Sequence, residues 1–202
     1  MIKKKNVVII MADQLRADVL GGQYTPNINK LAEEGVEFRR SYCASPLCVP
    51  ARGSFFTGKY PNETGSIINP WEKTDKKHGN VREGIPNLYS LMEQDWDSWH
   101  IGKQHFFTEE KIDASPTSKT HWVYTDKDYN NFLQTRKVKK PGGEAFKGML
   151  PEMVSGKVTH ISKYSIPTIG CYEEGVENYF DGYFTVGAVE AIRGRDKEKP
   201  FL

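Results

Sequence analysis

The sequence is poor in cysteine, has no long apolar run and shows no excess of one charge. Its 202 residues contain three cysteines, an odd number that argues against a disulfide framework. No apolar stretch approaches the roughly 20 residues that a membrane span needs, so we expect no membrane contact. The net charge of +2 gives no reason to expect a nucleic-acid partner.

The N-terminal segment resembles a secretory leader only faintly. A basic start at Met1–Lys5 precedes the apolar run Asn6–Ala12, but the run is too short and Asp13 interrupts it. We therefore expect a cytoplasmic protein by default. A periplasmic or secreted protein remains the alternative if a signal has been removed.

A cysteine at the start of a predicted helix is the most distinctive local feature. Cys48 precedes Pro50, which suits the first turn of a helix because its missing N–H costs nothing there. Phe55 and Phe56 give this helix an apolar side, and Gly58 can end it in a left-handed conformation. The N–H groups and the dipole at such a helix start favour an anion.

Arg52 lies about one helical turn after Cys48, so its guanidinium can reach back beside the thiol. A potential nucleophile and a cation thus lie together at an anion-friendly helix end. The alternative for Cys48 is a small buried hydrophobe near a turn. Cys43 has Pro46 at a different offset and no arginine in register, and we interpret it as structural. A zinc site is disfavoured because there is no second close cysteine pair and Cys171 stands alone.

The run Val7–Ala12 is continuous, apolar and rich in β-branched residues. It predicts a strand of a parallel sheet, with both faces of the strand buried. Such a strand delivers Asp13 and Gln14 at its carboxyl end, where ligands bind in open α/β sheets. An acid in this place can equally be a turn or cap residue.

Further segments predict alternating helices and strands. Thr25–Gly35 has the signals of a helix, with Thr25 as its cap and a proline at its first position. Its apolar face contains Ile28, Leu31 and Ala32. A strand is predicted to begin at Val36–Phe38.

A lysine and a histidine follow another predicted strand. Ile85–Met92 predicts a short helix, and Trp96–Ile101 alternates as a strand does. Lys103 and His105 then lie two residues apart, so their side chains can share a side if the chain stays extended. A solvated lysine and a core or surface histidine are the alternative.

The remaining chain has little clean periodicity at first. Residues 106–170 predict loops and short elements near the mouth of a site, where specificity usually lies. The basic run at 137–140 is interpreted as a solvated surface rather than a polyanion site. Thr185–Arg193 predicts a helix and Lys199–Leu202 the beginning of a strand.

Together, two of these stretches resemble the formylglycine-dependent sulfatase family. Cys-Val-Pro-Ala-Arg at 48–52 matches its Cys-x-Pro-x-Arg signature, residues 53–58 fit the continuation, and Gly-Lys-Gln-His at 102–105 matches its Gly-Lys-x-His signature. The resemblance covers nearly the whole chain. It implies that residues 1–202 are the N-terminal part of a single catalytic domain. It implies an α/β fold of the alkaline-phosphatase-like type, a sandwich with a largely parallel central sheet flanked by helices, incomplete at its C-terminal side.

The resemblance also implies an activity, sulfuric ester hydrolysis, on a small-molecule or saccharide sulfate ester. In the family, a formylglycine-generating maturation enzyme oxidises the cysteine that matches Cys48 to an aldehyde, whose hydrate attacks sulfur. Arg52 matches the residue that holds this diol. Lys103 and His105 match the residues that bind the sulfate and assist the leaving group.

By the same resemblance Asp13, Gln14 and the modified Cys48 are expected to bind a divalent metal, Ca²⁺ or else Mg²⁺ or Mn²⁺. Gln14 replaces the commoner acid, although its carbonyl oxygen is still a hard donor. Some relatives that hydrolyse phosphonate or phosphate esters also have Gln here, so a phosphonate monoester or phosphodiester hydrolase is the alternative. The family's other ligands are expected beyond Leu202, so we expect the 202 residues alone to be inactive. A non-catalytic relic domain is a further alternative.

Overall fold

The computed structural model describes most of the chain, namely residues 5–70, 76–141, 146–154, 157–166 and 172–202. The described residues separate into two compact units. The first unit contains residues 5–98, 105–120 and 196–202, and the second contains residues 99–104 and 121–195 within the described ranges. Cys171, the cysteine predicted to stand alone, lies outside the described residues.

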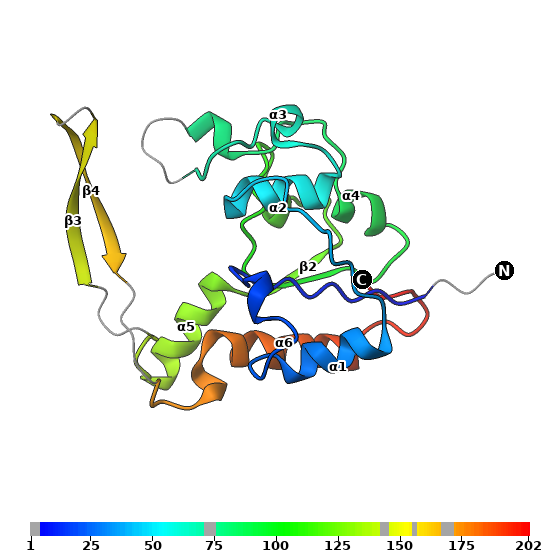
Figure 1. The fold of residues 1–202 in the computed structure, drawn as a ribbon. Helices are drawn as coiled ribbons and strands as arrows, with labels where there is room; N and C mark the ends of the chain where they lie inside the picture. Colours follow the sequence, from blue (N-terminus) through cyan, green and yellow to red (C-terminus); the bar gives the residue numbers. More distant parts are fainter. Residues whose placement is uncertain (1–4, 71–75, 142–145, 155–156, 167–171) are drawn as a thin grey trace. The chain divides into compact units, whose positions relative to one another are not determined.

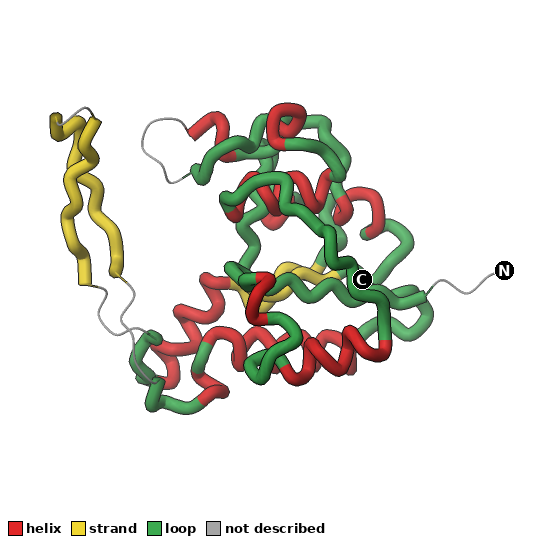
Figure 2. The backbone as a smooth tube through the Cα atoms, in the orientation of Figure 1, coloured by secondary structure: helices red, strands yellow, loops and turns green. Residues whose placement is uncertain are grey.

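Helices joined by loops make up most of the first unit, as the red and green tube of Figure 2 shows. The α-helices of this unit, all labelled in Figure 1, are α1 (Pro26–Glu34), α2 (Cys48–Thr57), α3 (Pro61–Thr64) and α4 (Leu88–Met92) within the described residues. Single 3-10 turns occur at Ala17–Val19, Lys76–Gly79 and Ile112–Ala114. Isolated parallel bridges join Val81 to Thr108 and Asp97 to Phe201.

An aromatic cluster forms the core of the first unit. The ring of Phe56, on α2, lies 5.1 Å from that of Tyr89, on α4, and 5.1 Å from that of Phe106. Phe106 is completely buried, and Val49 and Val81 are almost so. Burying a large side chain contributes about 1.5–3 kcal/mol, so this cluster anchors α2, α4 and the segment around Phe106 to one another.

The second unit contains the sheets and two longer helices. The strands β1 (Trp99–Gly102) and β2 (His121–Thr125) pair in parallel, with a shift of register between Ile101 and Gly102. The helices are α5 (Asp126–Arg136) and α6 (Phe180–Gly194), with a 3-10 turn at Val176–Asn178. The strands β3 (Phe146–Val154) and β4 (Lys157–Ile166) form an antiparallel pair, yellow in Figure 2.

The predicted α/β class is confirmed, and so are the helices with strong local signals. The helix predicted at Thr25–Gly35 is α1, which begins with Pro26. The helix predicted at Cys48 is α2, and Gly58 ends it with φ 68° while its N–H donates to Ser54 O at 2.8 Å. Thr185–Arg193 lies within α6. Pro at a helix start and Gly at a helix end act through local backbone preferences, which explains this success.

The strand predicted at Val7–Ala12 is absent, and so is the one predicted at Val36–Phe38. Val7 N donates to Phe201 O at 2.8 Å, but Ile10 is 87% exposed rather than buried on both faces. A central parallel strand needs hydrogen-bonded neighbours on both edges. In the described part of the chain this segment pairs with no strand, and the predicted strand at Lys199–Leu202 contains only an isolated bridge, from Phe201 to Asp97.

The predicted capping role of Thr25 is also wrong, although the residue does occupy the N-cap position of α1. Its hydroxyl donates to Val19 O at 3.2 Å and to Asn29 Oδ1 at 2.9 Å. Ile28 and Leu31 are 43% and 66% exposed, so the predicted apolar face exists but is not buried among the described residues.

Residues 106–170, expected to be loops and short elements, contain β2, α5, β3 and β4. The helix α5 begins with a capping box, because Thr125 Oγ1 accepts from Asp128 N and Thr125 N donates to Asp128 Oδ2. No helix in the described part of the chain combines the length and apolarity that a membrane span requires.

Candidate active site

Cys48 is the first residue of α2 and is half-buried. The preceding residue, Leu47, has no side-chain oxygen and cannot cap the helix. Buried Asn69 takes over this role, since its Oδ1 accepts from Val49 N at 3.3 Å and from the Cys48 thiol at 3.5 Å. A side chain distant in sequence thus satisfies an N–H group at the start of α2 and orients the thiol.

His105 lies beside the same thiol, with Nδ1 3.3 Å from Cys48 Sγ. The adjacent ring of Phe106 is completely buried, and Val81 N donates to Phe107 O at 2.8 Å. These contacts hold the segment after the histidine in place. His105 itself has φ 38°, an uncommon left-handed conformation that such surroundings can enforce. The imidazole is therefore positioned to exchange a proton with Sγ of Cys48.

Arg52 is buried one turn further along α2 and faces Asp13. Its Nη2 lies 3.7 Å from Asp13 Oδ1. Burial raises the pKa of the nearby Tyr89 hydroxyl far above its usual value, and the charge of Arg52 opposes this rise only in part. Arg52 thus contributes a fixed positive charge in a largely buried place, with an acid as partner.

Asp13 and Gln14 remain together after the segment predicted to be a strand. Gln14 has φ 55°, so the chain turns sharply there. The carboxylate and the amide oxygen are hard donors and fit Ca²⁺, Mg²⁺ or Mn²⁺ in kind. In number they fall short of the about 6–8 oxygens that Ca²⁺ takes. Among the described residues there is no group of three or more His, Cys, Asp and Glu that could hold a metal.

Lys103 follows β1 and Gly102 in the second unit, where its side chain is half-buried. The side chains of Lys103 and His105 would share a side only if the chain were extended there, and the backbone is not extended at His105. Of the predicted site residues, the structure therefore joins Cys48 with His105 and Arg52 with Asp13.

Asn69 is the residue that sequence reasoning missed. Its Asn-Pro step marks a turn, but nothing in that step indicates a partner about 20 residues earlier. A helix is normally capped by the residue that directly precedes it, which is Leu47 for α2. The signal was absent because Asn69 reaches α2 only through the tertiary fold.

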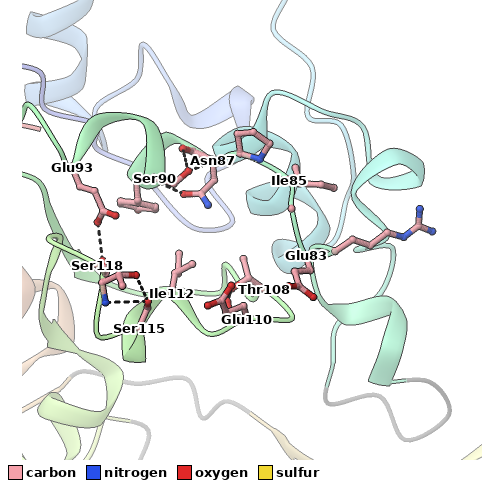
Figure 3. Close-up of a pocket in the computed structure, with 15 residues that line it drawn as sticks. Glu83, Ile85, Asn87, Ser90, Glu93, Thr108, Glu110, Ile112, Ser115 and Ser118 are labelled. Atoms are coloured by element: carbon pink, nitrogen blue, oxygen red, sulfur yellow. Dashed lines mark hydrogen bonds between the residues drawn. The ribbon is translucent and has the colours of Figure 1, made fainter.

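A cavity of about 340 Å³ also lies in the first unit, shown in Figure 3. Its lining comes from residues 82–93 and 108–118, and includes neither Cys48 nor His105. Figure 3 shows Glu93 turned toward Ser118. Burial raises the pKa of Glu93, but bonds from Ser118 Oγ at 2.8 Å and Thr120 Oγ1 at 2.9 Å help to hold it below its usual value. The Glu93 carboxylate therefore has a structural role, because it links α4 to Ser118 and Thr120. We do not assign it to the candidate active site.

Comparisons with known proteins agree with these features. A family model described as Sulfatase matches residues 5–202. An ulvan-active sulfatase of Formosa agariphila is 35% identical over 107 residues, 48% of this chain and 20% of that protein. A choline-sulfatase of Rhizobium meliloti is 30% identical over 148 residues, 69% of this chain and 26% of that protein.

An arylsulfatase of Clostridium perfringens is 32% identical over 114 residues, 54% of this chain and 22% of that protein. The matched stretches thus span about a fifth to a quarter of these relatives' own lengths. The family model, in contrast, covers almost all of the present chain. The chain therefore belongs to the sulfatase family, as the signatures at 48–52 and 102–105 predicted.

Proposed function

We propose that this chain forms the N-terminal part of a sulfuric ester hydrolase whose nucleophile derives from Cys48. The observation that carries the proposal is the placement of His105 Nδ1 at 3.3 Å from Cys48 Sγ, at the first residue of α2. Membership in the sulfatase family supports the reaction type. The small-molecule or saccharide sulfate ester that we propose as substrate carries the anionic group that a helix start favours.

A plain thiol does not suit this reaction, because its sulfated adduct has no internal route for breakdown. We propose that a maturation enzyme converts Cys48 to formylglycine, whose hydrate supplies a second hydroxyl that allows sulfate to be released. His105 then holds or returns the proton at position 48. The dipole of α2 favours negative charge at the start of this helix, and Asn69, which accepts from Val49 N, keeps that helix end in place.

Arg52 and Lys103 supply the positive charges of the proposed site. Arg52 is held by α2 and by Asp13, so its charge needs little reorganisation during the reaction. Lys103 follows Gly102, the last residue of β1, and is proposed to stabilise the charge that develops on the sulfuryl group and the leaving oxygen. Both roles are those of fixed cations rather than of proton donors.

Asp13 and Gln14, with the modified residue 48, would hold the divalent metal, which we propose to be Ca²⁺, or else Mg²⁺ or Mn²⁺. Such an ion would lower the pKa of the attacking oxygen and neutralise the sulfate. In the protein that carries this chain, Asp13→Ala should remove the bound metal and the activity while leaving the circular-dichroism spectrum unchanged. Elemental analysis measures the metal, and full occupancy in the variant would refute this role.

Gln14 is the observation that favours a second candidate, hydrolysis of phosphonate monoesters or phosphodiesters at the same site. A panel of aryl sulfate, phosphonate monoester and phosphodiester substrates separates the two, by the ratio of their kcat/KM values. Preference for a phosphorus ester would overturn the sulfatase assignment. A protein with neither aldehyde nor metal would be a non-catalytic relic.

A further inference from the structure

The second unit contains an aromatic pocket that the proposed hydrolysis does not use. Its volume is about 340 Å³, at the lower end of the range for small-molecule sites. The pocket is lined by Tyr124, Phe132, Arg136, Glu177, Tyr183 and Val186. These residues come from β2, α5, α6 and the turn before α6. The ring of Tyr183 lies 4.5 Å from that of Phe132 and 5.0 Å from that of Tyr124, so the three rings form connected walls.

Tyr124 lines this pocket in a strained backbone conformation. Its φ is 53°, a left-handed conformation that is unfavourable for a bulky side chain. Gly187 makes room for the ring, because a Cβ there would lie 2.3 Å from Tyr124 Cγ. The Tyr124 hydroxyl donates to Glu190, and this bond is the main cause that raises the pKa of Tyr124 to about 12. Strain that is retained at a cavity wall indicates a use for the ring.

Arg136 places a positive charge at the same pocket. Its guanidinium carbon lies 4.6 Å from the centre of the Phe132 ring, and its Nη1 donates to Asn178 Oδ1 at 3.0 Å. Two contacts therefore fix the group, while its several N–H donors leave capacity for an anion. Glu177 adds a carboxylate that can accept hydrogen bonds from hydroxyl groups.

We propose that this pocket binds a sugar ring that carries an acidic group, a carboxylate or a sulfate. The C–H faces of the ring would pack on Tyr124, Phe132 and Tyr183, and the hydroxyls would donate to Glu177. The acidic group would pair with Arg136 through charge-assisted hydrogen bonds. A purely aromatic acid would leave Glu177 without hydroxyl partners, so the lining favours the sugar. The proposal concerns binding alone and does not depend on hydrolysis at Cys48.

The test is a saturation-transfer NMR titration of the full chain with glucuronate, which has no sulfate ester and cannot be turned over by a sulfatase. Glucose and benzoate serve as the neutral-sugar and aromatic-acid probes. Glucuronate should bind at least about tenfold more tightly than either. No binding of glucuronate, or equal binding of benzoate, would overturn the proposal.

Variants assign the binding to this pocket. Arg136→Gln should weaken glucuronate binding at least about tenfold, since it removes the charge but keeps a polar side chain. Arg193→Gln, at an exposed arginine of α6 that does not line the pocket, is the matched control and should bind as the parent does. Phe132→Leu provides a second variant, which reduces the stacking surface, including that under Arg136, without removing a charge. Parental affinity in both pocket variants, with folded spectra, would refute this site.

Discussion

The helices α1 and α2 are similar in length but differ in how the fold uses them (Figure 1). The helix α1 has the clearer apolar face in the sequence, yet none of its residues is buried among the described part of the chain. The helix α2 buries residues along most of its length, including Arg52 and Phe56. Periodicity therefore did not decide burial here, because burial depends on which side chains the rest of the unit brings against the helix.

The two helix starts differ in the same way. The residue before α1 is Thr25, whose hydroxyl bonds to neighbours within six residues along the chain. The helix α2 starts after Leu47 and takes its cap from Asn69. The side-chain contacts at the start of α1 are thus local, whereas those around Cys48 are tertiary. The following variants test this difference.

The largest effect is expected at Cys48. In the protein that carries this chain, made with a competent maturation system, Cys48→Ala should lower activity by about a thousandfold or more, since no other group can form the reacting diol. Peptide mass spectrometry should find residue 48 lighter by the thiol-to-aldehyde change and reactive toward hydrazides, with no such change at Cys43 or Cys171. Cys43→Ala is the matched control and should stay active, because Cys43 is an exposed thiol that donates to Ser45 O. Active, matured protein with an unmodified thiol at position 48 would contradict the mechanism.

The next effect compares the stability of the two helices. Phe56→Ala should lower the free energy of unfolding by about 3–5 kcal/mol, because it empties the cluster with Tyr89 and Phe106. Leu31→Ala, on exposed α1, should cost less than about 1 kcal/mol. Denaturant unfolding measures both. Similar losses would show that α1 is as well packed as α2 and would remove the contrast.

A smaller effect is expected for the residues that act on the transferring group. In the protein that carries this chain, Lys103→Ala and His105→Ala should each lower kcat/KM at least about tenfold, a loss of roughly 1.4 kcal/mol or more. His121→Ala serves as a control, because this exposed histidine stacks on Trp99 at 4.2 Å and has no proposed catalytic role. Thermal stability should change little. Parental kinetics for both test variants would return Lys103 and His105 to ordinary surface or core residues.

The smallest effect concerns the cap of α2. Asn69→Ala should destabilise the fold by about 1 kcal/mol, because the N–H of Val49 loses its acceptor. Asn69→Asp keeps a side-chain oxygen near the helix start and should retain most of that stability. Thermal unfolding of the two variants distinguishes the cap from simple packing. Equal loss in both would mean that the amide group matters for another reason.

The fold was predictable where a residue acts on its own backbone. Pro26, Pro50 and Gly58 predicted helix boundaries correctly, because proline restricts its own φ and glycine tolerates a positive one. The prediction for Val7–Ala12 failed because a strand is defined by hydrogen bonds to other segments. The same reasoning applies to the candidate site, where Cys48 was found from its local pattern and Asn69 was not.

The sequence by itself determined the chemistry that is available: a cysteine at a helix start with Arg52 one turn on, an acid followed by an amide at 13–14, and the lysine and histidine at 103 and 105. Only the tertiary structure decided which of these groups meet. It placed His105 against Cys48 and Asp13 against Arg52, and it brought Asn69 to the start of α2. The physical reason is that residue type and spacing set local conformation, whereas contacts over tens of residues depend on the packing of the buried cluster around Phe56 and Phe106.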